Sequence, residues 1–270
     1  MRSTDSRTRA GREFLIRAGV TVAVVGGALV ALLNVPGVPY TWSVWRDGTW
    51  ATYIATGLWI TLYVSIGSLI VALVLGVIAG LMRMSKNIVV HQLGTIYVEL
   101  IRGTPLLVQI MIAYFCVALA VKKGLEAGGV AFGVVDASQN VTVWGIAVLG
   151  VFAGAYVAEI VRAALESIDP GQTEAALSQG MTKRQVFRLV LFPQALRRMI
   201  PPLTGQLVSL VKDSSLLSLI GLFELTNRAG IMRTSTYTVF EVLIPLAALY
   251  LVITLPLSVL ARRLELRLAA

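Results

Sequence analysis

Residues 174–194 read EAALSQGMTKRQVFRLVLFPQ, and their spacing of small, basic and apolar residues directs the interpretation of the whole chain. The chain is 57% hydrophobic, yet this stretch has the composition of a soluble protein surface. Just upstream, Asp169 suits a helix N-cap, Pro170 the first helical position and Gln172 the third. We expect a short helix from Pro170 to about Gln179 that stops at Gly180.

A second helix start follows at Thr182, where TKRQ places Gln185 three residues on and forms a capping box. The apolar residues that follow at helical spacing on one face are Val186, Phe187, Val190 and Leu191. Pro193 and then the pair Pro201–Pro202 interrupt the pattern. The sequence therefore predicts a second helix lying under the bilayer before the chain returns to the membrane.

The composition is that of a membrane protein, with a mean hydropathy of +0.81 and only 14% charged residues. An apolar helix of roughly 20 residues spans the hydrocarbon layer. The predicted fold is all-α, with about six transmembrane helices at residues 14–35, 56–82, 93–119, 141–163, 203–224 and 240–262. The single cysteine, Cys116, rules out a disulfide framework or a cysteine metal site, and no metal site is expected.

Basic residues set the orientation of a membrane protein, because Lys and Arg favour the cytoplasmic side. Alternate connecting segments carry sixteen Lys and Arg on one side and five on the other. Both termini and the loop at about 169–193 therefore belong in the cytoplasm. Residues 1–13 form a basic cytoplasmic arm, and residues 14–35 form a retained first span, because no cleavage site follows it.

The small residues Ala175, Ala176 and Gly180 favour close approach by another protein. A helix that only lay on lipid would expose bulky apolar residues and let its basic side chains snorkel. We therefore expect this first helix to enter a groove of a partner.

The stretch resembles the EAA loop of bacterial ABC importer permeases: Glu-Ala-Ala, three residues, Gly, nine residues, then an apolar ending with Pro. Here Val190 and Phe192 replace the more usual Ile and Leu before Pro193. Residues 99–109 (ELIRGTPLLVQ), 155–172 (AYVAEIVRAALESIDPGQ) and 210–225 (LVKDSSLLSLIGLFEL) resemble the polar amino-acid subfamily, which takes up His, Glu, Gln, Arg and opines. The resemblance covers residues 56–263, the ABC transmembrane type-1 domain, and leaves the role of residues 1–35 open.

The resemblance implies the fold of a type I (MetI-like) ABC importer permease in the bacterial inner membrane. The first helix would be the coupling helix, which docks on an ATPase dimer. Its coupling residues would be Gln172, Glu174, Ala175, Ala176, Gly180 and Met181. The other implied partners are a second permease, identical or a paralogue, and an extracytoplasmic solute-binding protein. The chain has no Walker A loop, so it is expected to be a transport subunit without a cofactor of its own, with ATP and Mg²⁺ bound by the ATPase.

Polar residues inside the spans are costly and mark either a pathway or an ion-pair lock. The candidates for the substrate pathway are Glu99, Arg102, Gln109, Glu159, Lys212, Asp213 and Ser214. Gly103–Thr104–Pro105 and the KDSS stretch, with a new cap at Asp213, predict breaks at which freed backbone groups can bind a ligand. Glu159 and Arg162 lie three apart on one helical face. Ion-pair locking of the bundle remains the alternative for Glu159, Lys212 and Asp213.

Two further patterns concern packing. Gly76 with Gly80, and Gly150 with Gly154, have the spacing of close helix contacts. Trp42, Trp45 and Trp50, with Tyr40, suit an aromatic belt at the outer interface.

The predicted function is translocation of polar amino acids as the permease subunit of an ATP-driven, binding-protein-dependent importer. A self-contained secondary transporter or channel for small polar solutes is the alternative, and it would need a coupling-ion site but no EAA loop. An integral membrane enzyme is disfavoured, because no nucleophile–base pair or metal cluster occurs in the sequence. The sequence leaves open which amino acid is carried and whether the two permeases are the same chain.

Overall fold

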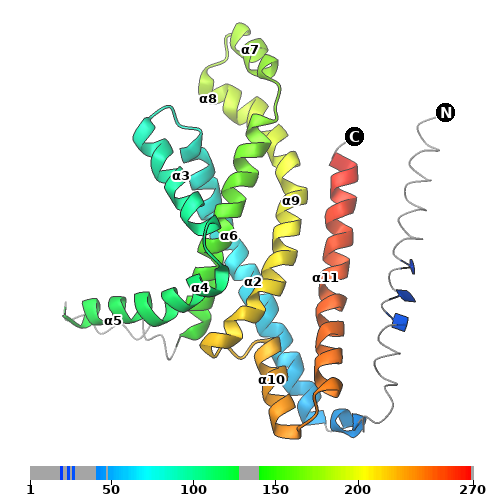
Figure 1. Cartoon of the computed structure of the whole chain (residues 1–270). Coiled ribbons are helices and arrows are strands. Elements are labelled where there is room, and N and C mark those ends of the chain that lie inside the picture. The colour runs from blue at the N-terminus through cyan, green and yellow to red at the C-terminus, as the bar shows by residue number, and fades with distance from the viewer. Residues whose placement is uncertain are drawn as a thin grey trace, which may run out of the picture.

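The computed structural model describes residues 19–20, 23–24, 26–27, 41–46, 48–127 and 140–268 of the 270-residue chain (Figure 1). These residues are helical apart from short connections and contain no strand, so the predicted all-α fold is confirmed. The first elements are η1 (Trp42–Arg46), α2 (Gly48–Arg83), α3 (Ile88–Arg102), α4 (Leu106–Met111), η2 (Ile112–Val117), α5 (Ala118–Ala127) and α6 (Val141–Glu166). The later ones are α7 (Pro170–Ser178), α8 (Lys183–Gln185), η3 (Val186–Leu191), α9 (Phe192–Asp213), η4 (Ser214–Ile220), α10 (Leu225–Thr236) and α11 (Phe240–Leu268).

Three of these helices are long and apolar enough to cross a bilayer alone, namely α2, α6 and α11. Two bent pairs qualify when each is counted as one span, so the described residues hold between three and five spans. The expected first span, residues 14–35, and the arm 1–13 lie largely or wholly outside the described residues. Figure 1 places α7 and α8 at one end of the molecule and α10, with the start of α2, at the opposite end.

The core of the bundle is the contact between α2 and α6. A Cβ atom on Gly76 would lie 2.4 Å from Cγ1 of Val157 and 2.9 Å from the carbonyl oxygen of Gly154. A Cβ on Gly150 would likewise lie 2.6 Å from Val71. The glycines let the two backbones approach, so the interpretation of their spacing as close packing within the chain is confirmed.

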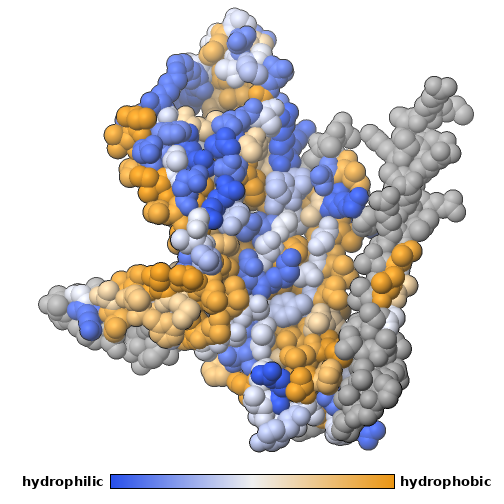
Figure 2. Space-filling model, viewed as in Figure 1, coloured by the Kyte–Doolittle hydropathy of each residue, from blue (hydrophilic) through white to orange (hydrophobic). Residues whose placement is uncertain are grey.

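The predicted span 93–119 is a bent pair of helices. The chain breaks at Gly103–Thr104–Pro105, as expected, and the second half, Leu106–Val121, turns by 104° from α3. Pro105 cannot donate a backbone hydrogen bond, and it disfavours helical geometry at the residue before it. The second half therefore leaves the bundle sideways, and Figure 2 shows it as a projecting, largely hydrophobic surface.

The predicted helix under the bilayer is also wrong as a separate element. Helix α8 begins at Lys183 with Thr182 as its N-cap, as expected, but it continues through the π-helical η3 into α9 without a gap. Pro193 follows the π-helical η3 directly, so the helical bond that its missing N–H cannot make falls in that irregular turn, while Pro201 and Pro202 lie inside α9. Membrane helices tolerate such prolines when local π-type adjustments satisfy the freed groups. One continuous helical segment, Lys183–Ile220, therefore runs from the loop into the bundle, and we call it the rod.

Candidate functional site

The loop between α6 and α9 is built by local capping. The carboxylate of Asp169 accepts a hydrogen bond from the backbone N–H of Gly171 at 2.7 Å and caps α7, whose first residue is Pro170. The helix ends in a Schellman motif, in which Met181 N–H donates to Ala176 and Gly180 N–H donates to Leu177. Gly180 takes a φ of +83°, which L-residues rarely adopt. The expected helix and its glycine stop are confirmed.

The small residues of α7 do not all face outward, which corrects the prediction of a small exposed face. Ala176 is only 5% exposed, and it lies on α7, which packs against η3. Gly180 serves the backbone turn, as its left-handed φ shows. Ala175 is the one of the three that presents a small side chain to the outside.

The outward surface of α7 combines polar and apolar groups. Gln172 and Glu174 are exposed, and Leu177 leaves 41% of its surface uncovered. Met181 is half-buried at the turn. One exposed leucine among polar residues is ordinary on a protein surface, so Leu177 alone does not mark a docking site.

The end of the loop is tied to the bundle. The guanidinium of Arg198 on α9 donates to the carbonyl and hydroxyl oxygens of Ser167, at 2.5 and 2.6 Å. The capping box at Thr182 and Gln185 holds the start of the rod that leads into α9. The loop that carries α7 is therefore fastened to both α6 and α9.

Glu159 is the centre of an ion-pair cluster that joins three helices. Its carboxylate pairs with Arg83 at the end of α2, at 2.5 Å, and with Arg162 one turn along α6. Arg102 at the end of α3 reaches the same carboxylate at 3.8 Å. Arg162 also pairs with Glu166 at 2.5 Å. Three cations around two carboxylates act as an interhelical brace, and Arg83 and Glu166 were not anticipated from the sequence.

Gln109 braces the break after α3. Its side-chain N–H₂ donates to the carbonyl oxygens of Ile101 and Thr104, at 2.7 and 3.1 Å, and contacts the Thr104 hydroxyl at 2.8 Å. In a continuous helix the Ile101 carbonyl would accept from residue 105, and Pro105 has no N–H, so the Gln109 amide takes its place there. Glu99 is exposed and stands apart from the Glu159 ion pairs in the described part of the chain.

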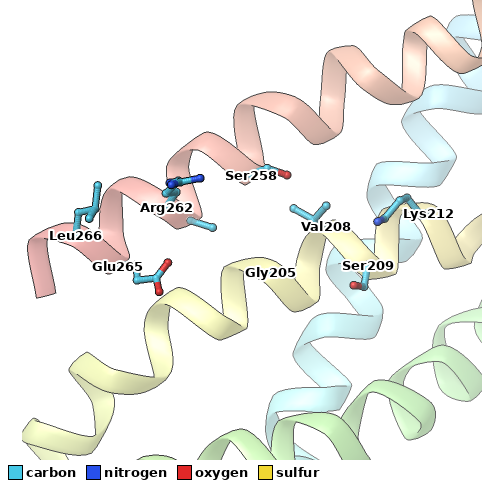
Figure 3. A pocket seen from close by; sticks show the side chains of 9 residues that line it. Gly205, Val208, Ser209, Lys212, Ser258, Arg262, Glu265 and Leu266 are labelled. Atoms are coloured by element: carbon cyan, nitrogen blue, oxygen red, sulfur yellow. The ribbon is translucent and has the colours of Figure 1, made fainter. Parts of the chain in front are cut away.

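A polar groove separates α9 from α11 (Figure 3). Its volume is about 570 Å³. The residues that line it are Gly205, Val208, Ser209, Lys212, Ser258, Ala261, Arg262, Glu265 and Leu266. Figure 3 shows Ser209 and Lys212 on α9, with Ser258, Arg262 and Glu265 on α11. Lys212 is the one predicted pathway residue that this groove contains.

The neighbours of Lys212 differ from expectation. Asp213 ends α9 with helical backbone angles and makes no side-chain cap, so the predicted new cap at Asp213 is wrong. The chain tightens instead from α-helix to the 3₁₀-helical η4. Ser214 is fully buried, and its hydroxyl donates to the carbonyl of Val211 at 2.9 Å.

A buried carboxylate at Glu224 escaped the sequence analysis. It caps α10 by accepting from the N–H groups of Thr226 and Asn227, at 2.8 and 2.7 Å. It also accepts from the hydroxyls of Thr61 on α2 and Tyr250 on α11. The signal was present in FELTN, where a glutamate follows a helix break and can serve as an N-cap. No cluster of His, Cys, Asp or Glu that could hold a metal occurs in the described residues.

Comparison with known proteins identifies the family of this chain. The profile of the binding-protein-dependent transport system inner membrane component matches residues 72–270. The chain belongs to this family. This permease is 35% identical over 207 residues to the glutamine transport system permease protein GlnP of Escherichia coli (strain K12), covering 77% of this chain and 89% of that protein. It is 36% identical over 218 residues to the probable glutamine ABC transporter permease protein GlnP of Bacillus subtilis (strain 168), covering 80% and 93%.

Solved structures agree with this placement. The permease superposes on a chain of the crystal structure of an amino acid ABC transporter with histidines, with a TM-score of 0.69 and 34% identity. The match covers 82% of this permease and 97% of that chain. The inward-facing MetNI methionine ABC transporter, at 21% identity and a TM-score of 0.63, shares the fold, covering 81% and 97%. The expected ABC importer permease with a MetI-like fold is confirmed, and ATP hydrolysis belongs to a separate subunit.

Proposed function

We propose that this permease carries a polar amino acid of the glutamine class across the cytoplasmic membrane of a bacterium, powered by a separate ATPase dimer. The capped α7, in a chain of the binding-protein-dependent permease family, carries this proposal, because a self-contained transporter has no use for a loop that meets a separate ATPase. The names of the relatives support the amino-acid class. ATP and Mg²⁺ bind to the ATPase, and this chain supplies the path.

The complete importer contains two permeases and a solute-binding protein outside the cell. Both termini and α7 face the cytoplasm, as the basic residues indicate. ATP binding closes the ATPase dimer and draws the two α7 helices together. The unbroken rod from Lys183 to Ile220 transmits this displacement to the wall of the groove that carries Lys212.

Substrate contact is assigned to the groove between α9 and α11. The Lys212 ammonium suits the carboxylate of an amino acid. The Glu265 carboxylate lies at the other end of the groove in Figure 3, so it would meet the amino group at a separate position along the path. The hydroxyls of Ser209 and Ser258 complete a polar path through apolar surroundings. In this proposal Glu159, Arg102 and Gln109 hold helices in place, because their polar groups are engaged by the chain itself.

Reconstitution distinguishes this function from a secondary transporter. In liposomes, the permease with its ATPase and binding protein should take up glutamine only with ATP. The permease alone should not respond to a proton or sodium gradient.

The variant Leu177→Asp tests the coupling role of α7. It should abolish ATP-driven uptake and co-purification of the ATPase. The control is Leu189→Asp on η3, where the leucine is more exposed, at 60% against 41% for Leu177, and uptake should be retained. Gradient-driven uptake without the ATPase would contradict the importer.

A further inference from the structure

Arg228 on α10 is held as a fixed cation at the end of the molecule opposite α7 (Figure 1). Its guanidinium carbon lies 4.3 Å from the ring centroid of Tyr53 on α2, a cation–π contact. Its Nε donates to the carbonyl of Phe223 at 2.9 Å, and Nη1 donates to the carbonyl of Tyr53 at 3.2 Å. Gly57 leaves room for its stem, because a Cβ there would lie 2.8 Å from Cδ of Arg228.

This guanidinium retains donors for an outside group. A guanidinium has five N–H donors, and the chain uses two of them in the hydrogen bonds above. Within the described ranges, no carboxylate forms an ion pair with Arg228. The side chain is half-buried, so its free edge is reachable from outside. A rigidly held guanidinium with no ion-pair partner is suited to bind a carboxylate through paired hydrogen bonds.

The cation borders a hollow of about 800 Å³. The residues that line it are Gly48, Thr49, Trp50, Thr52, Tyr53, Thr56, Arg228 and Ile231. Trp50 and Tyr53 meet edge to face with centroids 5.9 Å apart, so the aromatic wall is fixed as well. Arg, Trp and Tyr are the residues that most often carry the energy of protein interfaces. The lining contains no acidic residue.

The residues around the hollow indicate whether the carboxylate comes from a free amino acid or from a side chain of a partner protein. Beyond the hollow, the exposed face of α2 continues with Trp59, Tyr63, Ile66 and Ile70. A free amino acid bound at Arg228 would meet this apolar face and have no polar group to move to. A side chain that stays attached to a partner needs no onward path.

We propose that Arg228 and this aromatic hollow receive an acidic side chain of the solute-binding protein when it docks on the permease. The inference rests on the proposed function, which places this end of the molecule outside the cell. The ion pair fixes the orientation of the binding protein over the two permeases and raises its rate of association.

The test measures binding of the system's own solute-binding protein to the whole permease–ATPase complex in nanodiscs. Arg228→Gln should weaken binding about tenfold at low salt and remove most of the salt dependence. Arg228→Lys should weaken it about threefold, because the charge remains but the planar fork is lost. Arg233→Gln, an exposed arginine on the same helix outside the hollow, is the matched control and should stay within twofold.

Thr52→Asp is a second variant that spares the Arg228 packing. Thr52 is exposed on the wall of the hollow. A new carboxylate there should repel the acidic side chain and weaken binding of the solute-binding protein about fivefold without disturbing the fold. Unchanged binding in both Arg228→Gln and Thr52→Asp overturns the proposal. So does an Arg228→Gln variant that alters the KM for amino acid, or the need for anionic lipid, at unchanged binding-protein affinity. If the wild-type complex neither binds the protein nor hydrolyses ATP in response to it, the importer function itself fails.

Discussion

At the scale of single residues, the charges around Glu159 show how a membrane protein keeps ionised groups. Arg83 is only 14% exposed and shares the Glu159 carboxylate with Arg162 and Arg102. Removing one member of such a cluster leaves partly buried cations without compensation, which costs more than the lost pair alone. Glu159 is therefore needed as a counter-charge whether or not substrate passes nearby.

Glu159→Gln should lower the free energy of unfolding by roughly 2 kcal/mol, between the ~0.5 kcal/mol of an exposed pair and the ~4 kcal/mol of a buried one. Arg102→Gln is the matched control, since Arg102 is 41% exposed and 3.8 Å away, and should cost under about 1 kcal/mol. Denaturant unfolding and the yield of assembled complex measure the effect. A Glu159→Gln complex of normal stability that loses uptake per assembled complex would instead make Glu159 a substrate contact.

The sequence predicts only part of this cluster. Glu159 and Arg162 share a helical face, so their pairing follows from spacing along one helix. Arg83 lies 76 residues earlier, and only the packing of α2 on α6 brings it to Glu159. Gln109 was predicted only as a pathway residue, and its hydrogen bonds across the helix break depend on the 104° turn, which no local pattern specifies.

At the scale of elements, the contact of α2 with α6 depends on glycines at the crossing. Gly76→Ala would force a Cβ to 2.4 Å from Val157 and 2.9 Å from a backbone oxygen, which cannot move cheaply. We expect a loss of roughly 3 kcal/mol or failure to assemble, as for overpacked cores.

Gly67→Ala on the same helix is the matched control for this prediction. Its new Cβ would meet the flexible end of Ile146 at 3.0 Å, so we expect a loss of about 1 kcal/mol or less. Thermal unfolding of the two purified variants compares them. Equal melting temperatures would show that α2 and α6 do not pack this tightly.

Elements whose ends are fixed by local chemistry were predicted well. Asp169, Gly180 and the Thr182–Gln185 box define helix ends through contacts a few residues apart, and all three are confirmed. The interior prolines misled the analysis, because local propensity treats Pro201–Pro202 as a stop. Packing of α9 against α6 and α11 overrides that preference and keeps the helix continuous.

At the scale of the whole molecule, one polar loop and one fixed cation lie at opposite ends of an apolar bundle. The rod that starts at Lys183 links the loop to the groove, while α10 and the start of α2 carry Arg228 at the far end. An importer needs this polarity, because its energy source is inside the cell and its substrate arrives from outside. The arrangement works only if the bent pair of α9 and α10 crosses the bilayer once, since a re-entrant loop would return α10 to the side of α7.

Cysteine labelling tests this crossing. Ser178→Cys at the end of α7 and Ser235→Cys near the end of α10 place similar, exposed thiols on the two sides of the bent pair, in a Cys116→Ser background. An impermeant maleimide added to intact cells should label Ser235→Cys at once and Ser178→Cys only after the membrane is permeabilised, because the basic residues around α7 hold it inside. Labelling of both from the same side would make α9 and α10 re-entrant. The reverse pattern would invert the molecule and place Arg228 in the cytoplasm, where no solute-binding protein can reach it.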